Sequence, residues 1–164
     1  MKKIPRLILP LSMWVIASSA IAQTAPPPQN PAAVWSFDQF LGNDPNVKMV
    51  AEPTARVHDP IVGFPTQADG VVGQALKLDG LATRLTRTAD KAPALGEAFS
   101  FEGWIALQEY PWNWAAILNQ EAERKSGWFF GISGEGRVGL HVAKDGMWIE
   151  CNSKSQLPLL KWSH

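Results

Sequence analysis

Apolar and polar residues alternate along much of the chain with a period of two. The most regular run covers residues 99–107, where Phe99, Phe101 and Ile105 share one side and Ser100 and Glu102 the other. A strand with one buried face has this period, because successive side chains point to opposite faces. The pattern predicts strands here and in further segments, which are residues 33–40, 73–80, 127–133, 137–143, 147–153 and 157–162.

Glycine, proline, asparagine and aspartate separate these segments. Residues 41–70 break at such residues every few positions, which favours loops and short edge strands. Residues 133–136 and the Asp145-Gly146 pair predict two hairpin turns, because these residue types tolerate positive φ. Residues 115–125 come nearest to a helical pattern, and we expect only a short turn there. Short strands joined by glycine turns predict an all-β fold, an antiparallel sandwich or barrel.

The N-terminal residues have the features of an export signal. Three basic residues come first, an apolar stretch follows from residue 7 to about residue 17, and Ala20-Ile21-Ala22 fits a signal-peptidase site. The apolar stretch is shorter than the roughly 20 residues of a membrane span, although an uncleaved membrane anchor is the alternative. We expect a signal peptide over residues 1–22, a proline-rich linker over 23–32, a β domain over 33–164, and a periplasmic or extracellular location.

Charge and cysteine content narrow the classes of partner. Without the three basic residues of the signal, 12 basic residues remain against 15 acidic ones, a net charge of about −3. This balance argues against nucleic acid, whose phosphates are bound by basic clusters. Cys151 is the only cysteine, so an internal disulfide is excluded. After cleavage of the signal, no membrane association is expected.

Four segments resemble one family when they are taken in order. They are VWSFD (34–38), GVVGQALKLDG (70–80), LGEAFSFEGWI (95–105), and GWFFGISGEGRVGLHV (127–142) running on to LPLLKWSH (157–164). Together they are similar to the laminin-G-like (LamG-like) module of the concanavalin A-like lectin and glucanase superfamily. The resemblance covers most of the mature chain and implies an antiparallel two-sheet jelly-roll sandwich.

The resemblance also sets an expectation for the C-terminal side. In that family further strands follow the Trp-Ser-His step, which here is the end of the sequence at His164. We therefore expect an incomplete sandwich, with the missing C-terminal strands or a downstream catalytic domain in a longer polypeptide. The family setting implies the N-terminal part of a larger exported glycoside hydrolase-like protein.

Catalytic motifs are weak in this sequence. The enzymes of the superfamily carry a Glu-x-Asp-x-x-Glu strand, which places two carboxylates on one face for glycoside hydrolysis, and the sequence has no such run. Asp44, Asp59 and Glu150 resemble, in order, the nucleophile, sugar-binding and acid positions of β-fructosidase propeller enzymes. His58 stands where that family has arginine, and a propeller needs far more chain. We expect no catalytic residue in this chain, with a β-fructosidase fragment as the less favoured alternative.

A structural calcium ion is implied by the resemblance. Asp38 occupies the early-strand carboxylate position of the family site, and the Gly80 carbonyl is a second candidate ligand. The late aspartate of the family lies beyond His164, so calcium would lack one hard oxygen ligand and bind weakly here. The three histidines and Cys151 show no metal-ligand spacing.

Large aromatic residues supply the candidate binding site. Tyr110, Trp112 and Trp114 follow the run 99–107, Pro111 interrupts the strand between them, and Trp148 follows the Asp145-Gly146 turn. The apolar face of a sugar ring stacks on such rings, so the sequence predicts a non-catalytic module that binds an oligo- or polysaccharide. The alternative is a structural or protein-interaction β-sandwich, in which these rings fill the ends of the core.

Overall fold

The computed structural model describes residues 31–95 and 98–164. The predicted signal peptide (1–22) and residues 23–30 of the predicted linker lie outside the described residues. The described part is built from β-strands, with one three-residue 3-10 helix, η1 (Ala89–Lys91), and no α-helix. No helix in this part is long and apolar enough to cross a membrane. The prediction of an all-β fold is confirmed at this level.

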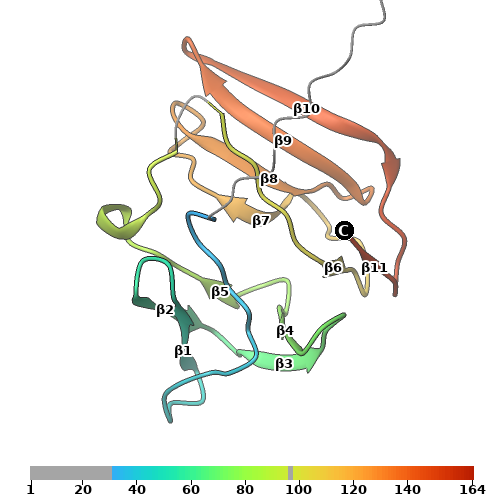
Figure 1. Cartoon of the computed structure of the whole chain (residues 1–164). Coiled ribbons are helices and arrows are strands. Elements are labelled where there is room, and N and C mark those ends of the chain that lie inside the picture. The colour runs from blue at the N-terminus through green and yellow to red at the C-terminus, as the bar shows by residue number, and fades with distance from the viewer. Residues whose placement is uncertain (1–30, 96–97) are drawn as a thin grey trace, which may run out of the picture. The chain divides into compact units, whose positions relative to one another are not determined.

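The strands form four sheets (Figure 1). A three-stranded sheet has the order β1-β2-β5, a four-stranded sheet has the order β10-β9-β8-β7, and β3-β4 and β11-β6 are two-stranded. Every strand pair is antiparallel. The strand bounds are β1 Val47–Glu52, β2 Val57–Val62, β3 Thr66–Asp69, β4 Gln74–Lys77, β5 Arg84–Leu85, β6 Ile105–Ala106, β7 Ala115–Asn119, β8 Trp128–Ile132, β9 Arg137–Lys144, β10 Met147–Gln156 and β11 Trp162–Ser163.

The four-stranded sheet follows the sequence pattern closely. Strands β8, β9 and β10 lie where the alternation predicts them, and Gly136, at the end of the first hairpin turn, has φ 77°. In the second turn, Asp145 and Gly146 have φ 53° and 75°, as the turn chemistry requires. Residues 115–119 form strand β7 rather than part of a short turn, because they pair with β8. These residues carry no glycine or proline that would oppose an extended backbone.

Three predicted strands are wrong or much shorter than expected. In the predicted strand 157–162 only Trp162 belongs to a strand, β11, because Leu159 makes just a single bridge. The other two are residues 33–40 and 99–107. Residues 33–40 form no strand, because the Val34 N–H is donated to a carboxylate of Glu52 and Phe37 has φ 57°. Of residues 99–107 only β6 forms a ladder, with β11, and Leu107 makes a single bridge to Leu159. The alternation in residues 33–40 and 99–107 reflects partial burial of the side chains on one side of each segment. A β-ladder also requires a neighbouring strand to which the backbone can hydrogen-bond, and most of these residues lack one.

Strand β2 corrects the prediction of short edge strands in residues 41–70. It has β1 on one side and β5 on the other, although it contains Pro60. The Thr86 N–H donates to the Pro60 carbonyl at 3.0 Å, but Pro60 has no N–H to return. The ladder between β2 and β5 consequently covers only the pairs Ile61 with Leu85 and Val62 with Arg84.

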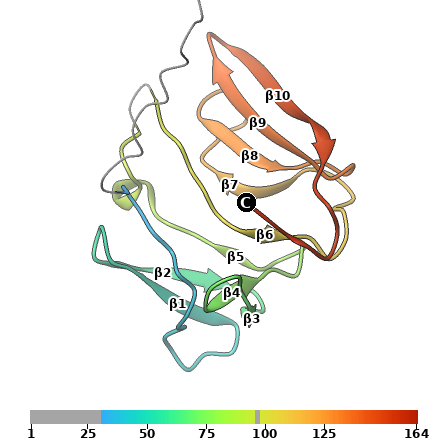
Figure 2. The ribbon, with the colours of Figure 1, turned by 45° about the vertical axis from the view of Figure 1, so that its right-hand side comes forward.

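Apolar side chains gather on one face of the four-stranded sheet. Phe101 lies 5.6 Å from Trp128 and 4.2 Å from Phe130 between ring centroids, and Phe99 lies 5.3 Å from Trp128. The segment that leads into β6 crosses this face, on the side toward β5, in both views (Figures 1 and 2). We call this the inner face and the opposite one the outer face. Ile132 at the end of β8 is 2 % exposed.

Candidate functional site

A row of aromatic side chains covers the outer face of the four-stranded sheet. Phe129 on β8 pairs with His141 on β9, and paired residues project from the same face. The His141 ring centroid lies 5.4 Å from Phe129, 4.4 Å from Trp114 and 5.9 Å from Trp148 on β10. Both tryptophans meet the imidazole edge-on, at 77° and 85°. We call Trp114, Phe129, His141 and Trp148 the aromatic row.

Glycine gives Trp114 its place over the sheet. A Cβ at Gly139 on β9 would lie 2.6 Å from Cη2 of Trp114 and 2.6 Å from Oδ1 of Asn152, closer than real side-chain atoms approach. The indole therefore lies directly on the backbone of β9, which a larger residue at position 139 would prevent. Trp114 is partly buried, so part of its ring remains open to solvent.

His141 is 4 % exposed, and its imidazole is hydrogen-bonded to the side chain of Asn152. Its Nε2 lies 3.0 Å from Oδ1 of Asn152 on β10. With the amide oxygen toward Nε2, this nitrogen carries the proton, because an amide oxygen only accepts. The Nδ2 amino group of Asn152 then remains available for another acceptor.

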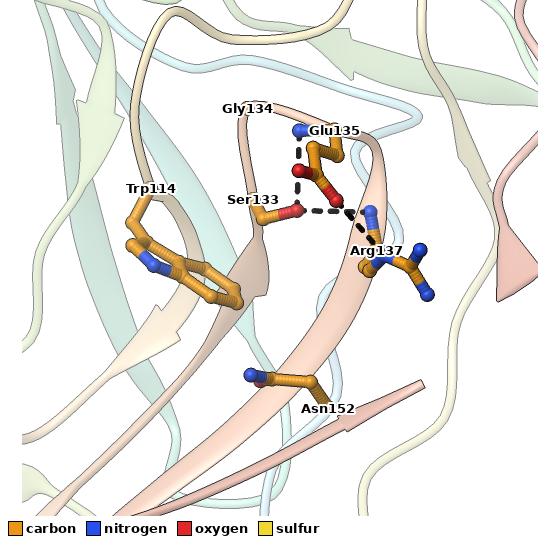
Figure 3. Close-up of a pocket in the computed structure, with 6 residues that line it drawn as sticks. All are labelled: Trp114, Ser133, Gly134, Glu135, Arg137 and Asn152. Carbon is orange, nitrogen blue, oxygen red and sulfur yellow. Dashed lines mark hydrogen bonds and ion pairs between the residues drawn. The ribbon is translucent and has the colours of Figure 1, made fainter. Parts of the chain in front are cut away.

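A hollow of about 290 Å³ lies beside Trp114 at the end of β8 and β9 (Figure 3). The indole forms one side, Asn152 lies below, and the turn over residues 133–137 forms the other side. Ser133 Oγ accepts the backbone N–H groups of Glu135 and Arg137 at 3.2 and 3.1 Å, which holds the turn. The hollow therefore combines one aromatic wall with polar groups on a fixed backbone.

Arg137 is hydrogen-bonded to protein groups through its Nε and Nη1 atoms. Its Nε donates to Oε2 of Glu135 at 3.0 Å, and its Nη1 donates to the carbonyl oxygens of Ser153 and Lys154. Arg137 is the one cation among the described residues that line the hollow, and its charge is balanced by Glu135. The hollow thus offers hydrogen-bonding groups with little net charge.

The four aromatic residues predicted from the sequence lie in three places. Trp114 and Trp148 both contact His141 in the aromatic row. The Tyr110 hydroxyl donates to the carbonyl of Leu157 at 2.8 Å, and its ring lies against Gly136. Trp112 is 90 % exposed. The fold brings Trp114 and Trp148, which lie 34 residues apart in the sequence, to the same histidine, and Trp112 contacts no other ring among the described residues.

Sequence reasoning missed the residues that connect the two tryptophans. His141, Phe129 and Asn152 are not among the site residues that the sequence predicts. The sequence does carry one signal, because Gly139 and His141 share one face of β9 within its apolar middle part, residues 138–143. That signal gains meaning only when the register with β8 and β10 is known.

The predicted calcium ligands have other roles. The Asp38 carboxylate accepts the backbone N–H of Gln74 at 2.9 Å. Gly80 lies in a turn with φ 71°, where Oδ1 of Asp79 accepts the N–H groups of residues 81, 82 and 83. These bonds lower the pKa of Asp79 to about 2. Among the described residues, no group of three or more His, Cys, Asp or Glu side chains is placed to hold a metal ion.

The three carboxylates of the β-fructosidase alternative lie in different parts of the fold and have different surroundings. Asp44 accepts the backbone N–H of Asn46 in a local turn, while Glu150 lies exposed on β10 opposite His141. Asp59 is 3 % exposed and accepts hydrogen bonds from the Trp35 indole at 2.7 Å and from Arg87. Both carboxylate oxygens of Asp59 thus accept hydrogen bonds from protein donors.

Asp59 belongs to a buried charge cluster of the three-stranded sheet. Arg87 bridges Asp59 and Glu52, and its guanidinium lies 5.0 Å from the centroid of the Trp35 ring. Hydrogen bonds with Asp59 raise the pKa of Arg87 further. We call Glu52, Asp59 and Arg87 the charge cluster. A second hollow, of about 110 Å³, lies beside it between β2 and residues 86–91.

Comparisons with protein-family models, curated proteins and solved structures found no match to this chain.

Proposed function

We propose that this chain is a non-catalytic, carbohydrate-binding module of the laminin-G-like jelly-roll type, exported as part of a larger glycoside hydrolase-like protein. The observation that carries the proposal is the partly open Trp114 ring beside a hollow with an available Asn152 amide. Carbohydrate sites combine an aromatic platform for the C–H face of the sugar with planar polar side chains for its hydroxyls. Both components are present on one rigid sheet.

The chemistry of the hollow supports binding rather than turnover. Its one carboxylate, Glu135, is paired with Arg137, and its one hydroxyl, on Ser133, accepts two backbone N–H groups. A nucleophile needs a base within hydrogen-bond distance, and glycoside hydrolysis needs a pair of carboxyl groups. The described residues that line the hollow supply neither arrangement.

The test is a glycan array probed with the whole chain, followed by calorimetry on each saccharide bound. Trp114→Ala is expected to weaken binding by about tenfold or more, which is about 1.4 kcal/mol or more. Trp112→Ala is the matched control, because that ring is 90 % exposed and lies outside the aromatic row. Asn152→Ala, which keeps the ring, gives a second reading if Trp114→Ala disturbs folding.

One observation favours a different function. The exposure of Trp112 and of apolar side chains such as Phe64 (66 %) and Leu81 (89 %) suits contact with another protein. On that alternative the chain is a structural or protein-interaction sandwich. Absence of saccharide binding by the folded wild-type chain, or binding lost with Trp112→Ala and kept with Trp114→Ala, would overturn our proposal in its favour.

A further inference from the structure

We propose that the outer face binds an uncharged, linear glycan lying along β9, with one sugar unit stacked on Trp114 at the hollow and another on Trp148. This inference rests on the proposed function and adds the length, the direction and the charge of the ligand. Three observations carry it, which are the spacing of the two tryptophans, the position of His141 between them, and the charge pairing in the hollow.

The two tryptophans lie at different levels along β9. Trp114 lies over Gly139, whereas Trp148 is paired with Ala143, four residues further along the strand. Four residues of a strand span about 13 Å at roughly 3.3 Å per residue. The two indole centroids are closer than this, at most about 10 Å apart, because they lie 4.4 and 5.9 Å from the His141 centroid. A single sugar ring is too small to stack on both indoles. A ligand that uses the whole aromatic row therefore has more than one unit and runs with the strand.

His141 fills the space between the two stacking positions. Its ring is nearly buried and lies nearly perpendicular to both indoles, so it separates the two tryptophans, which are themselves only partly buried. Its Nε2 is occupied by Asn152, which directs the free Nδ2 amino group toward the same face. The hydrogen bonds to a sugar would thus form near Trp114, where the hollow lies. Near Trp148 the contact would be stacking of a sugar ring on the indole.

The charges on this face favour an uncharged ligand. Arg137 donates through Nε and Nη1 to Glu135 and to two backbone carbonyls, which leaves its Nη2 group, and the exposed Glu135 carboxylate beside it would repel a carboxylate or a sulfate. Glu150, exposed on β10 opposite His141, adds a negative charge between the two tryptophans. An acidic glycan along β9 would pass this carboxylate and be repelled.

Chain length gives the sharpest test. Calorimetry is performed with β-1,4-linked glucose, xylose and mannose oligosaccharides of one to about six units, together with any other linear neutral series found on the array, and with oligogalacturonates as the acidic series. For the neutral series that binds, affinity is expected to rise about tenfold or more between one unit and about three units and then to level off. The oligogalacturonates are expected to bind at least about tenfold more weakly at equal length.

Two variants distinguish the contributions of the two stacking positions, Trp114 and Trp148, to binding. Trp114→Ala is expected to weaken binding of every length, whereas Trp148→Ala weakens only the longer chains and so removes the length dependence. Trp148→Leu, which keeps much of the side-chain volume without the flat ring, gives the same reading if Trp148→Ala unfolds.

The outcomes are distinct from those of the proposed function. If no saccharide binds the folded chain, the proposed function itself fails. If saccharides bind with an affinity independent of length, or if Trp148→Ala weakens a monosaccharide as much as a hexasaccharide, the two-position arrangement is wrong and the proposed function stands. Equal or tighter binding of oligogalacturonates would overturn the assignment of an uncharged ligand.

Discussion

The three-stranded sheet and the four-stranded sheet differ in the kind of side chain that they bury. In the first, the buried side chains include the charge cluster, with Glu52 and Asp59 at 1 % and 3 % exposure around one arginine. In the second, aromatic rings cover both faces, and the one buried polar group, His141, lies among them. The first arrangement fixes backbone through directed hydrogen bonds, while the second leaves flat apolar surface at the solvent boundary. We therefore expect stability to depend on the first sheet, and the proposed binding function to depend on the second.

The largest expected effect breaks the charge cluster. Arg87→Met is expected to lower the free energy of unfolding by about 3–5 kcal/mol, because it leaves two buried carboxylates without their cation. Urea denaturation measures the change. Arg84→Met is the matched control, since Arg84 is exposed and its Nη1 reaches only the Ala82 carbonyl at 3.3 Å. A loss below about 1 kcal/mol for Arg87→Met would mean that the cluster does not hold the three-stranded sheet.

Acid acts on the same cluster through Glu52. Burial favours the neutral form, but the N–H groups of Ala55, Val34 and Thr54 outweigh it and lower the pKa of Glu52 from 4.5 to about 2. The unfolded chain therefore takes up this proton first, and the stabilisation is complete above pH 4.5 and lost progressively as the pH falls toward 2. The shift corresponds to at most about 3 kcal/mol.

The acid effect is measured by unfolding midpoints across this pH range. Glu52→Gln should be less stable at neutral pH and show a flatter dependence between pH 4.5 and 2. Identical pH profiles for the variant and the wild type would contradict this assignment.

A smaller effect is expected in the four-stranded sheet. Gly139→Ala places a methyl group 2.6 Å from the Trp114 ring and from Asn152 Oδ1. The ring must move, at a cost of about 1–3 kcal/mol for overpacking. Near-ultraviolet circular dichroism reports the displaced indole, and urea denaturation reports the stability. Gly103→Ala is the control, because a Cβ there meets no atom within 4 Å. An unchanged spectrum for Gly139→Ala would mean that Trp114 does not lie on β9.

The sequence predicts best the elements whose pairing is local. Strands β8, β9 and β10 are joined by short glycine turns, so alternation and turn chemistry together determine both the strands and their neighbours. Residues 33–40 show the same alternation, but Trp35 is held by an indole hydrogen bond to Asp59, 24 residues further along the chain. Alternation indicates that one side of a segment packs against the protein. It does not indicate whether the segment pairs with a neighbouring strand.

The candidate site was predictable only in part for the same reason. The abundance of tryptophan points to residues 110–114 and 148, and two of these rings, Trp114 and Trp148, do lie together. Their connection through His141 depends on the register of three strands, which a single sequence does not provide. The binding role of these residues stays a prediction, as does the calcium site at Asp38 and Gly80.

Pro60 has a consequence for the behaviour of the protein in concentrated solution. Because it ends the pairing of β2 with β5, the edge strand β5 is only two residues long, whereas β1 at the other edge has six. An exposed strand edge is a template on which a second molecule can add a strand, and short edges limit such association. A proline in the middle of a sheet, which usually weakens it, here protects that edge against self-association.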